Sequence, residues 1–210
     1  MINTLISYDD QDFSLGEYFH KSLEELKKRI NNSNIAPNYL DGALCTLDHI
    51  EQRIKEYNSN KFIFVAFSHG RDNCLHTSSD EYVNSTNSSS FKDTLFYSTA
   101  CHCSTELGPE LIANGCYSFV GYSDKVNIHP EYQDDFINCE IHAIVEFLNS
   151  DVSIGDAYKS MHRKYDETII RLLMSDSMAD VITASTLAHN QTLLTILGNQ
   201  NLMASDLHSD

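Results

Sequence analysis

The sequence is poor in basic residues. It has 14 Lys and Arg against 30 Asp and Glu, for a net charge of −16, and its longest basic run is Lys27–Lys28–Arg29. Because an acidic surface repels phosphate groups, this composition argues against nucleic acid and against an anionic membrane as partners. Such a surface attracts basic ligands and basic polypeptide segments.

Long apolar runs are absent as well. No window approaches the ~18 consecutive apolar residues of a membrane-spanning helix, and residues 1–11 lack the basic flank and apolar run of a signal peptide. We therefore expect a cytoplasmic protein. The sequence also has no Cys-x-x-Cys motif, and its six cysteines, at positions 45, 74, 101, 103, 116 and 139, follow no repeated spacing. In a reducing compartment most of them should be free thiols.

The remaining composition is that of an ordinary folded domain. Hydrophobic residues make up 41% and charged residues 21% of 210 residues. An α/β chain of this length buries roughly 70% of its unfolded surface, so it needs neither disulfides nor a metal to hold its fold. We interpret residues 1–210 as a single domain.

Short apolar runs alternate with amphipathic stretches along the chain. The runs predict strands at residues 3–8, 61–67, 94–100, 116–121 and 193–197. Apolar spacings of three and four predict helices at residues 15–30, 40–57, 106–114, 132–148 and 154–173, whereas 174–190 permits helix or strand. This order predicts an α/β fold with a mostly parallel sheet and right-handed crossovers.

One segment carries no clear periodicity. Residues 71–93 are polar and include the low-complexity stretch 84–90. Long loops without secondary structure are usually functional or disordered. We expect a mobile loop here that covers a cleft until a ligand, partner or substrate orders it.

Two reactive side chains stand at predicted strand ends. His69 follows the run KFIFVAF at 61–67, and Cys101 follows TLFYSTA at 94–100. In an open parallel sheet, ligands collect at the carboxyl ends of the strands, so neighbouring strands would bring imidazole and thiol into one crevice. This pair is a candidate general acid/base and nucleophile. The N–H groups of Gly70 and Cys101 are the candidate oxyanion hole.

These motifs resemble those of the caspase-like (clan CD) cysteine peptidases. Ser68–His69–Gly70 and Ser98–Thr99–Ala100–Cys101 are similar to the family's His-Gly and Ala-Cys motifs, each after an apolar strand. VSIGDAY at 152–158 and residues 196–202 are weaker matches, and the closest motifs are those of bacterial CHAT, metacaspase and gingipain-like members. The resemblance implies a three-layer α/β/α caspase-like sandwich and a Cys101–His69 dyad.

The sequence departs from true caspases in two ways. The signature Gln-Ala-Cys-x-Gly is absent because Thr99 precedes Ala100, and the His-to-Cys separation, 101 − 69 = 32, is shorter than the ~50 of caspases. Both departures argue against an aspartate-specific caspase. Cys103 also stands two places after Cys101, which leaves Cys103 open as an alternative nucleophile.

Substrate preference is inferred from charge. The resemblance implies that the loop after the first strand and the loops near the cysteine line the pocket for the P1 side chain. Family members that cleave after Arg or Lys place carboxylates in these loops. The acidic residues of this sequence at those positions are Asp9, Asp10, Asp12, Glu106 and Asp124. We therefore expect a basic P1 residue.

The resulting hypothesis is a cysteine endopeptidase that forms a thioester acyl-enzyme. Its partners would be a protein or peptide substrate and an activating ligand or partner protein. The resemblance also suggests regulated cleavage in a bacterial defence response. No organic cofactor is implied, and calcium is left open because of the many surface carboxylates.

Two other interpretations remain open. The chain could be a catalytically silent caspase-like scaffold or receptor that binds a protein partner. Alternatively, soft ligands near the strand ends could bind zinc, although their spacing is poor for a tetrahedral site. Those ligands would come from His69, Cys74, His76, Cys101, His102 and Cys103.

Overall fold

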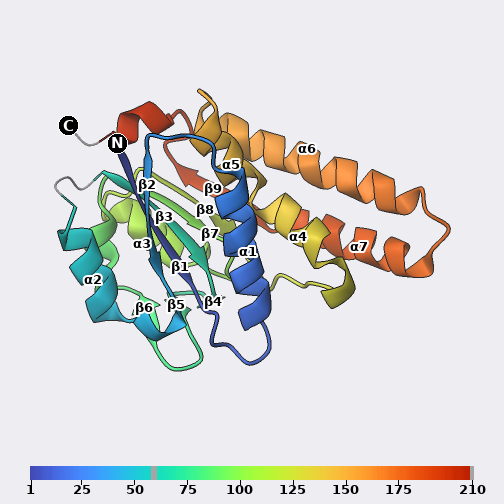
Figure 1. Ribbon diagram of the computed structural model, residues 1–210, viewed down its shortest axis with the longest axis horizontal. Coiled ribbons are helices and arrows are strands. Elements are labelled where there is room, and N and C mark those ends of the chain that lie inside the picture. Colours follow the sequence, from blue (N-terminus) through green and yellow to red (C-terminus); the bar gives the residue numbers. More distant parts are fainter. Residues whose placement is uncertain (58–60, 209–210) are drawn as a thin grey trace.

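The computed structural model describes residues 1–57 and 61–208. A six-stranded sheet lies at its centre, in the order β2-β1-β3-β7-β8-β9 (Figure 1). Neighbouring strands run parallel except for β9, which is antiparallel to β8. The strands are β1 (Ile2–Tyr8), β2 (Ile35–Leu40), β3 (Phe62–Phe67), β7 (Leu95–Ser98), β8 (Ser118–Tyr122) and β9 (Leu194–Gly198). The predicted mostly parallel α/β sheet is confirmed.

Helices cover both faces of the sheet. They are α1 (Gly16–Arg29), α2 (Leu47–Lys55), α3 (Leu107–Ala113), α4 (Gln133–Glu140), α5 (His142–Asn149), α6 (Ile154–Leu173) and α7 (Met178–Thr192). Residues of α1 and α4 to α7 join one buried cluster, and residues of α2 and α3 join the other. The chain is thus a three-layer α/β/α sandwich.

Strand β3 shows how one sequence supplies both cores. All six of its residues are buried, and alternate side chains enter opposite clusters because successive strand residues point to opposite faces. Ile63, Val65 and Phe67 pack against the helices of the α1 side, and Phe62, Phe64 and Ala66 pack on the α2 side. A run that is apolar on both faces is therefore the mark of a central parallel strand.

Strand β2 was missed by the sequence prediction. The predicted helix at 40–57 begins too early, because Leu40 ends β2 and the helix α2 starts at Leu47 after a short 3-10 turn, η1 (Gly42–Leu44). The strand IAPNYL contains Pro37, which pairs with Thr4 of β1. Proline is tolerated there because β2 is an edge strand.

Segment 71–93 has secondary structure of its own, contrary to the expected long loop. Strands β4 (His69–Arg71), β5 (Cys74–His76) and β6 (Glu81–Val83) form a small antiparallel sheet, followed by the 3-10 turn η2 (Ser88–Phe91). Its apolar side chains, Leu75, Tyr82, Val83 and Phe91, are fully buried in the α2-side core. The sequence pattern did not predict these buried residues, because they are few and are separated by many polar residues.

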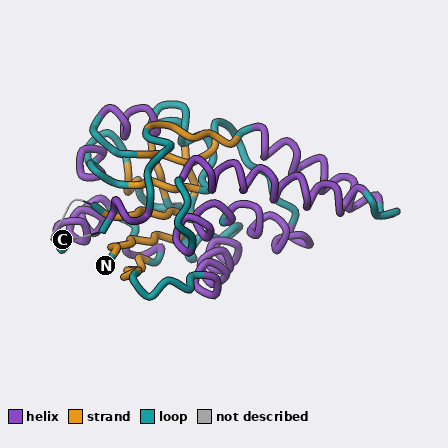
Figure 2. Tube along the Cα trace, turned by 90° about the horizontal axis from the view of Figure 1, so that it is seen from above, coloured by secondary structure: helices purple, strands orange, loops and turns teal. Residues whose placement is uncertain are grey.

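The C-terminal helices extend beyond the sheet. Helices α6 and α7 form a long hairpin that projects from the rest of the molecule (Figure 2). The segment 174–190, which the sequence left open, lies mostly in the helix α7. The predicted helix at 132–148 is two helices, α4 and α5, with Ile141 between them. Within the described residues, no helix has the length and apolar character required to cross a membrane.

Candidate functional site

The candidate site lies at the point where the order of strands in the sheet reverses relative to the chain. From β1 the chain first adds β2 on one side and then β3 on the other, so the connections after β1 and β3 diverge. A crevice at the carboxyl ends of the strands is expected at such a switch point. Asp12 follows β1, His69 follows β3 and Cys101 follows β7, so all three stand at this edge.

His69 and Cys101 line the same pocket. The pocket has a volume of about 50 Å³, and β3 and β7 are neighbouring parallel strands. Its lining residues are Leu15, Tyr18, Phe19, Ser68, His69, Thr99, Cys101, Val126, Ile128 and Glu140. The structure thus brings together the two side chains that the sequence singled out.

Three neighbours position the His69 ring. Its Nε2 lies 3.1 Å from Oδ2 of Asp12. Phe19 of α1 contacts the ring edge to face, with centroids 5.4 Å apart, and His76 of β5 stacks on it at 5.6 Å. An imidazole fixed on one nitrogen by a carboxylate is oriented for proton transfer at the other nitrogen.

Asp12 also holds the turn that leads into α1. Its Oδ1 accepts hydrogen bonds from the backbone N–H groups of Ser14, at 2.9 Å, and Leu15, at 2.7 Å. Burial alone would raise the pKa of Asp12, but these bonds, a bond from the Ser14 hydroxyl and the nearby His69 lower the pKa to about 2. The sequence placed Asp12 in substrate binding, whereas the structure sets it against His69. An Asp followed by Ser before a predicted helix start was the available signal for this turn.

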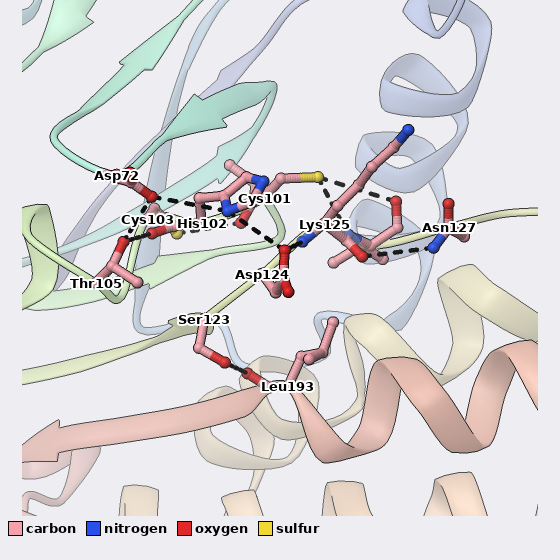
Figure 3. A network of polar contacts seen from close by, with 12 residues as sticks. Asp72, Cys101, His102, Cys103, Thr105, Ser123, Asp124, Lys125, Asn127 and Leu193 are labelled. Atoms are coloured by element: carbon pink, nitrogen blue, oxygen red, sulfur yellow. Dashed lines mark hydrogen bonds and ion pairs between the residues drawn. The ribbon is translucent and has the colours of Figure 1, made fainter.

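Cys101 is the one cysteine of the six that is not fully buried. Its sulfur accepts a hydrogen bond from the N–H of Val126 at 3.3 Å and points toward the 125–127 segment, away from Cys103 (Figure 3). Burial raises the pKa of the Cys101 thiol, and the bond to Val126 only partly offsets this. The Cys101 thiol in turn donates to the carbonyl of Val126 at 3.9 Å.

Cys103 is enclosed in the α2-side core. Its side chain has no exposed surface, its thiol donates to the carbonyl of Ala100 at 3.1 Å, and burial raises its pKa to about 11. A Cβ at Gly121 would lie 3.0 Å from this sulfur, so the packing around it is tight. Of the two candidate nucleophiles, only Cys101 reaches the pocket.

Gly70 lies directly against the backbone at Cys101. A Cβ at position 70 would stand 2.5 Å from the carbonyl oxygen of Cys101 and 2.8 Å from the Cβ of Ala100. No residue with a side chain fits this approach without displacement of the chain. In the described part of the chain, the Cys101 N–H contacts its own sulfur and donates to no other residue. This N–H therefore stays available for the predicted oxyanion hole.

The turn after Cys101 has an unusual backbone conformation. His102 has φ 59°, in the left-handed region that non-glycine residues seldom adopt. Its N–H donates to the carbonyl of Asp124 at 3.2 Å, and its Nδ1 lies 3.5 Å from Oδ1 of Asp124 and 3.7 Å from Oδ1 of Asp72 (Figure 3). These contacts tie the turn to the loop after β8 and to the β4–β5 hairpin.

The other predicted substrate-binding acids lie apart from the pocket. Asp9 is fully buried with its Oδ1 close to Gly42, and burial, together with the charge of Asp12, raises its pKa. Asp10 accepts a hydrogen bond from the N–H of Gly42 at 3.1 Å. Glu106 is exposed at the start of α3, and Asp124 is exposed beside His102. None of these four lines the pocket that holds His69 and Cys101.

The acid that does line this pocket is Glu140, which the sequence analysis did not single out. It is the last residue of α4, is 2% exposed, and accepts a hydrogen bond from the hydroxyl of Tyr18 at 2.8 Å. Burial raises the pKa of Glu140 to about 8, and the Tyr18 bond offsets only part of the shift. The sequence signal was a lone acid on the apolar face of a helix.

The zinc interpretation finds no support in the geometry. Among residues 1–57 and 61–208, no three His, Cys, Asp or Glu side chains are grouped so that they could hold a metal ion. The comparisons add no family: no protein-family model matches the chain, and no curated protein matches it significantly. Any functional conclusion therefore depends on the geometry of the site.

Proposed function

We propose that the chain is a caspase-like cysteine endopeptidase that cleaves after basic residues through Cys101 and His69. The observation that carries this proposal is that both side chains line one pocket at the carboxyl ends of the neighbouring strands β3 and β7. The position next to the β1/β3 switch point is the one where open α/β sheets bind ligands. The motif resemblance to the clan CD peptidases supports the same reaction class.

The reaction begins with proton transfer from the Cys101 thiol to His69. The thiolate then forms a bond to the scissile carbonyl carbon, and the carbonyl electron pair moves to oxygen, where the Cys101 N–H beside Gly70 stabilises it. The intermediate collapses, the C–N bond breaks, and His69 returns its proton to the departing amine. This step leaves a thioester on Cys101.

Hydrolysis of the thioester restores the enzyme. His69 takes a proton from water, the resulting hydroxide attacks the thioester carbonyl, and the C–S bond breaks to release the acid and regenerate the thiol. Asp12 holds the His69 ring in both halves of the reaction because its carboxylate lies 3.1 Å from Nε2. In this proposal Asp12 is a positioning residue, since it contacts His69 and does not line the pocket.

The resting state supports regulation by a ligand or partner. Burial raises the pKa of the Cys101 thiol, and the sulfur is engaged by the Val126 N–H. A buried thiol of this kind is a poor nucleophile until it is deprotonated. We infer that substrate or an activating partner moves the 123–129 segment and releases the sulfur.

Covalent labelling tests the proposal. The protein is incubated with peptidyl chloromethyl ketones that carry Lys or Arg at P1, and the adduct is located by mass spectrometry. We expect modification of Cys101, lost in Cys101→Ala and in His69→Ala, and retained in Cys103→Ala. An adduct on Cys103 would move the nucleophile. Absence of any adduct, also after addition of lysate as a source of activators, would favour the silent scaffold that binds a protein partner.

A further inference from the structure

Glu140 is a buried acid without a basic partner. Its Oε2 accepts the bond from Tyr18, whereas Oε1 has no hydrogen-bond partner in the described part of the chain. None of the ion pairs among the described residues includes Glu140. Burial of a carboxyl without a compensating charge lowers the stability of the fold, and groups of this kind concentrate at functional sites.

The walls around Glu140 are apolar and aromatic. Leu15 and Phe19 contribute one side of the pocket, and Val126 and Ile128 contribute another. A pocket that combines apolar walls with a carboxyl complements a side chain with an apolar stem and a cationic head. Lysine and arginine both have this construction.

The carboxyl offers only one free oxygen. Because Tyr18 already donates to Oε2, a guanidinium that bonds both oxygens, the arrangement that favours arginine, would have to share Oε2 with the Tyr18 hydroxyl. A planar fork also needs more room than a pocket of about 50 Å³ offers. An ammonium is a compact point charge and needs a single oxygen. The geometry therefore favours lysine over arginine.

We propose that Glu140 determines specificity at the dyad by pairing its carboxylate with the ammonium of a lysine P1 side chain. This inference rests on the proposed peptidase function and names the acid of its P1 subsite. It replaces the acids of the β1 loop, which lie outside the pocket.

Entry of a lysine side chain requires the pocket to widen. A volume of about 50 Å³ holds roughly one or two water molecules. Val126 and Ile128 lie in a coil segment between β8 and η3 (Pro130–Tyr132), which is easier to displace than the helices α1 and α4 on the other walls. Movement of this segment also withdraws the Val126 N–H from the Cys101 sulfur.

Ionisation of Glu140 is linked to binding of the cation. The titratable groups that face Glu140 from the surrounding elements are Tyr18 of α1, Tyr97 of β7, Tyr122 of β8, Tyr165 of α6, Cys139 of α4 and Cys101. Burial raises the pKa of every one of them. None of these six groups is cationic. His69 lines the same pocket, and because it becomes cationic when it takes the Cys101 proton in the proposed reaction, its charge would then compete with the ammonium for Glu140.

The test compares substrates that differ only at P1, with Lys, Arg, norleucine or Gln. We expect the kcat/KM of the parent protein to favour Lys over Arg about tenfold. Glu140→Gln keeps the volume and an acceptor for Tyr18, and it should lower the ratio of kcat/KM for Lys to kcat/KM for norleucine roughly a hundredfold. Tyr18→Phe frees the second oxygen and should shift the preference toward Arg. Glu131→Gln, an exposed acid, is the charge control and should change neither ratio.

A second readout needs no catalysis. Binding of n-butylammonium to Cys101→Ala protein is measured by calorimetry between pH 6 and 9, with and without Glu140→Gln. Affinity should rise up to about tenfold per pH unit below 8 and then level off, and Glu140→Gln should abolish the binding.

The outcomes separate the two proposals. Cleavage after Lys that is unaffected by Glu140→Gln overturns the role of Glu140 and leaves the peptidase standing. Butylammonium binding that depends on Glu140, without cleavage of any substrate, overturns the peptidase and retains the cation site. Neither cleavage nor Glu140-dependent binding overturns both.

Discussion

The Nε2 atom of His69 lies 3.1 Å from Oδ2 of Asp12, and this contact joins the connection after β1 to the end of β3. The same carboxylate holds the turn before α1 through its Oδ1. One aspartate thus fixes this turn and a histidine ring at once. The orientation of the candidate general base is therefore coupled to local folding at the switch point.

Asp12→Asn should reduce peptidase activity without unfolding the protein. The asparagine carbonyl can still accept the bonds from Ser14 and Leu15, but its amide group would face Nε2 as a donor and select the wrong tautomer of His69. We expect kcat/KM to fall about a hundredfold, because misplacement of a catalytic group has effects of this size. Activity equal to that of the parent protein, with an intact circular dichroism spectrum, would remove Asp12 from the mechanism.

The Asp12 carboxylate should also stabilise the fold above pH 4. Its pKa is about 2 in the folded chain against 3.8 for an ordinary aspartate, so the folded state binds the proton more weakly. The stabilisation is present above pH 3.8 and disappears as the pH falls to 2. Urea unfolding at pH 6 should show Asp12→Asn less stable by about 1 to 2 kcal/mol, and the difference should vanish near pH 2.

Alkylation of the native protein should begin at Cys101. The other five cysteines are buried, and burial raises the pKa of each of them. Mass spectrometry after brief iodoacetamide treatment at pH 8 should find a single adduct, at Cys101, and all six should react in urea. Rapid native modification of Cys103 would contradict the described packing.

Stability should fall with rising pH because of Glu140. The folded chain keeps the Glu140 proton up to a pKa of about 8, whereas an ordinary glutamate releases it near 4.5. Between these values the unfolded chain binds fewer protons, so the free energy of unfolding decreases by up to about 1.4 kcal/mol per pH unit. Unfolding curves between pH 5 and 9 should show this decline in the parent protein and a smaller decline in Glu140→Gln. Parallel curves for the two proteins would refute the buried, protonated state.

Gly70→Ala should displace the backbone at Cys101. The new Cβ would stand 2.5 Å from the Cys101 carbonyl oxygen, so the chain must shift. Overpacking of this kind destabilises by about 1 to 3 kcal/mol. Thermal melting measures the loss, and the rate of Cys101 alkylation reports whether the thiol has moved. An unchanged melting temperature and rate would mean that the close approach is not required.

Much of the architecture could be predicted from local patterns. The apolar run at 61–67 and the helical spacing at 154–173 correspond closely to β3 and α6 because each pattern reflects burial along one element. The edge strand β2 was missed because half of its residues face solvent or carry polar groups. The small sheet β4–β6 was missed because its core residues are few and widely spaced.

The sequence by itself determined the α/β order and placed His69 and Cys101 at strand ends. A buried strand is a continuous apolar run, so the run and the residue that follows it can both be identified from neighbouring positions in the sequence. Tertiary structure decided which side chains meet there. Asp12 contacts His69, and Cys103 is buried in the core on the α2 side of the sheet. Glu140 lines the pocket although it belongs to α4, far along the chain. Such contacts depend on the packing of whole elements against one another, and no local pattern encodes their direction.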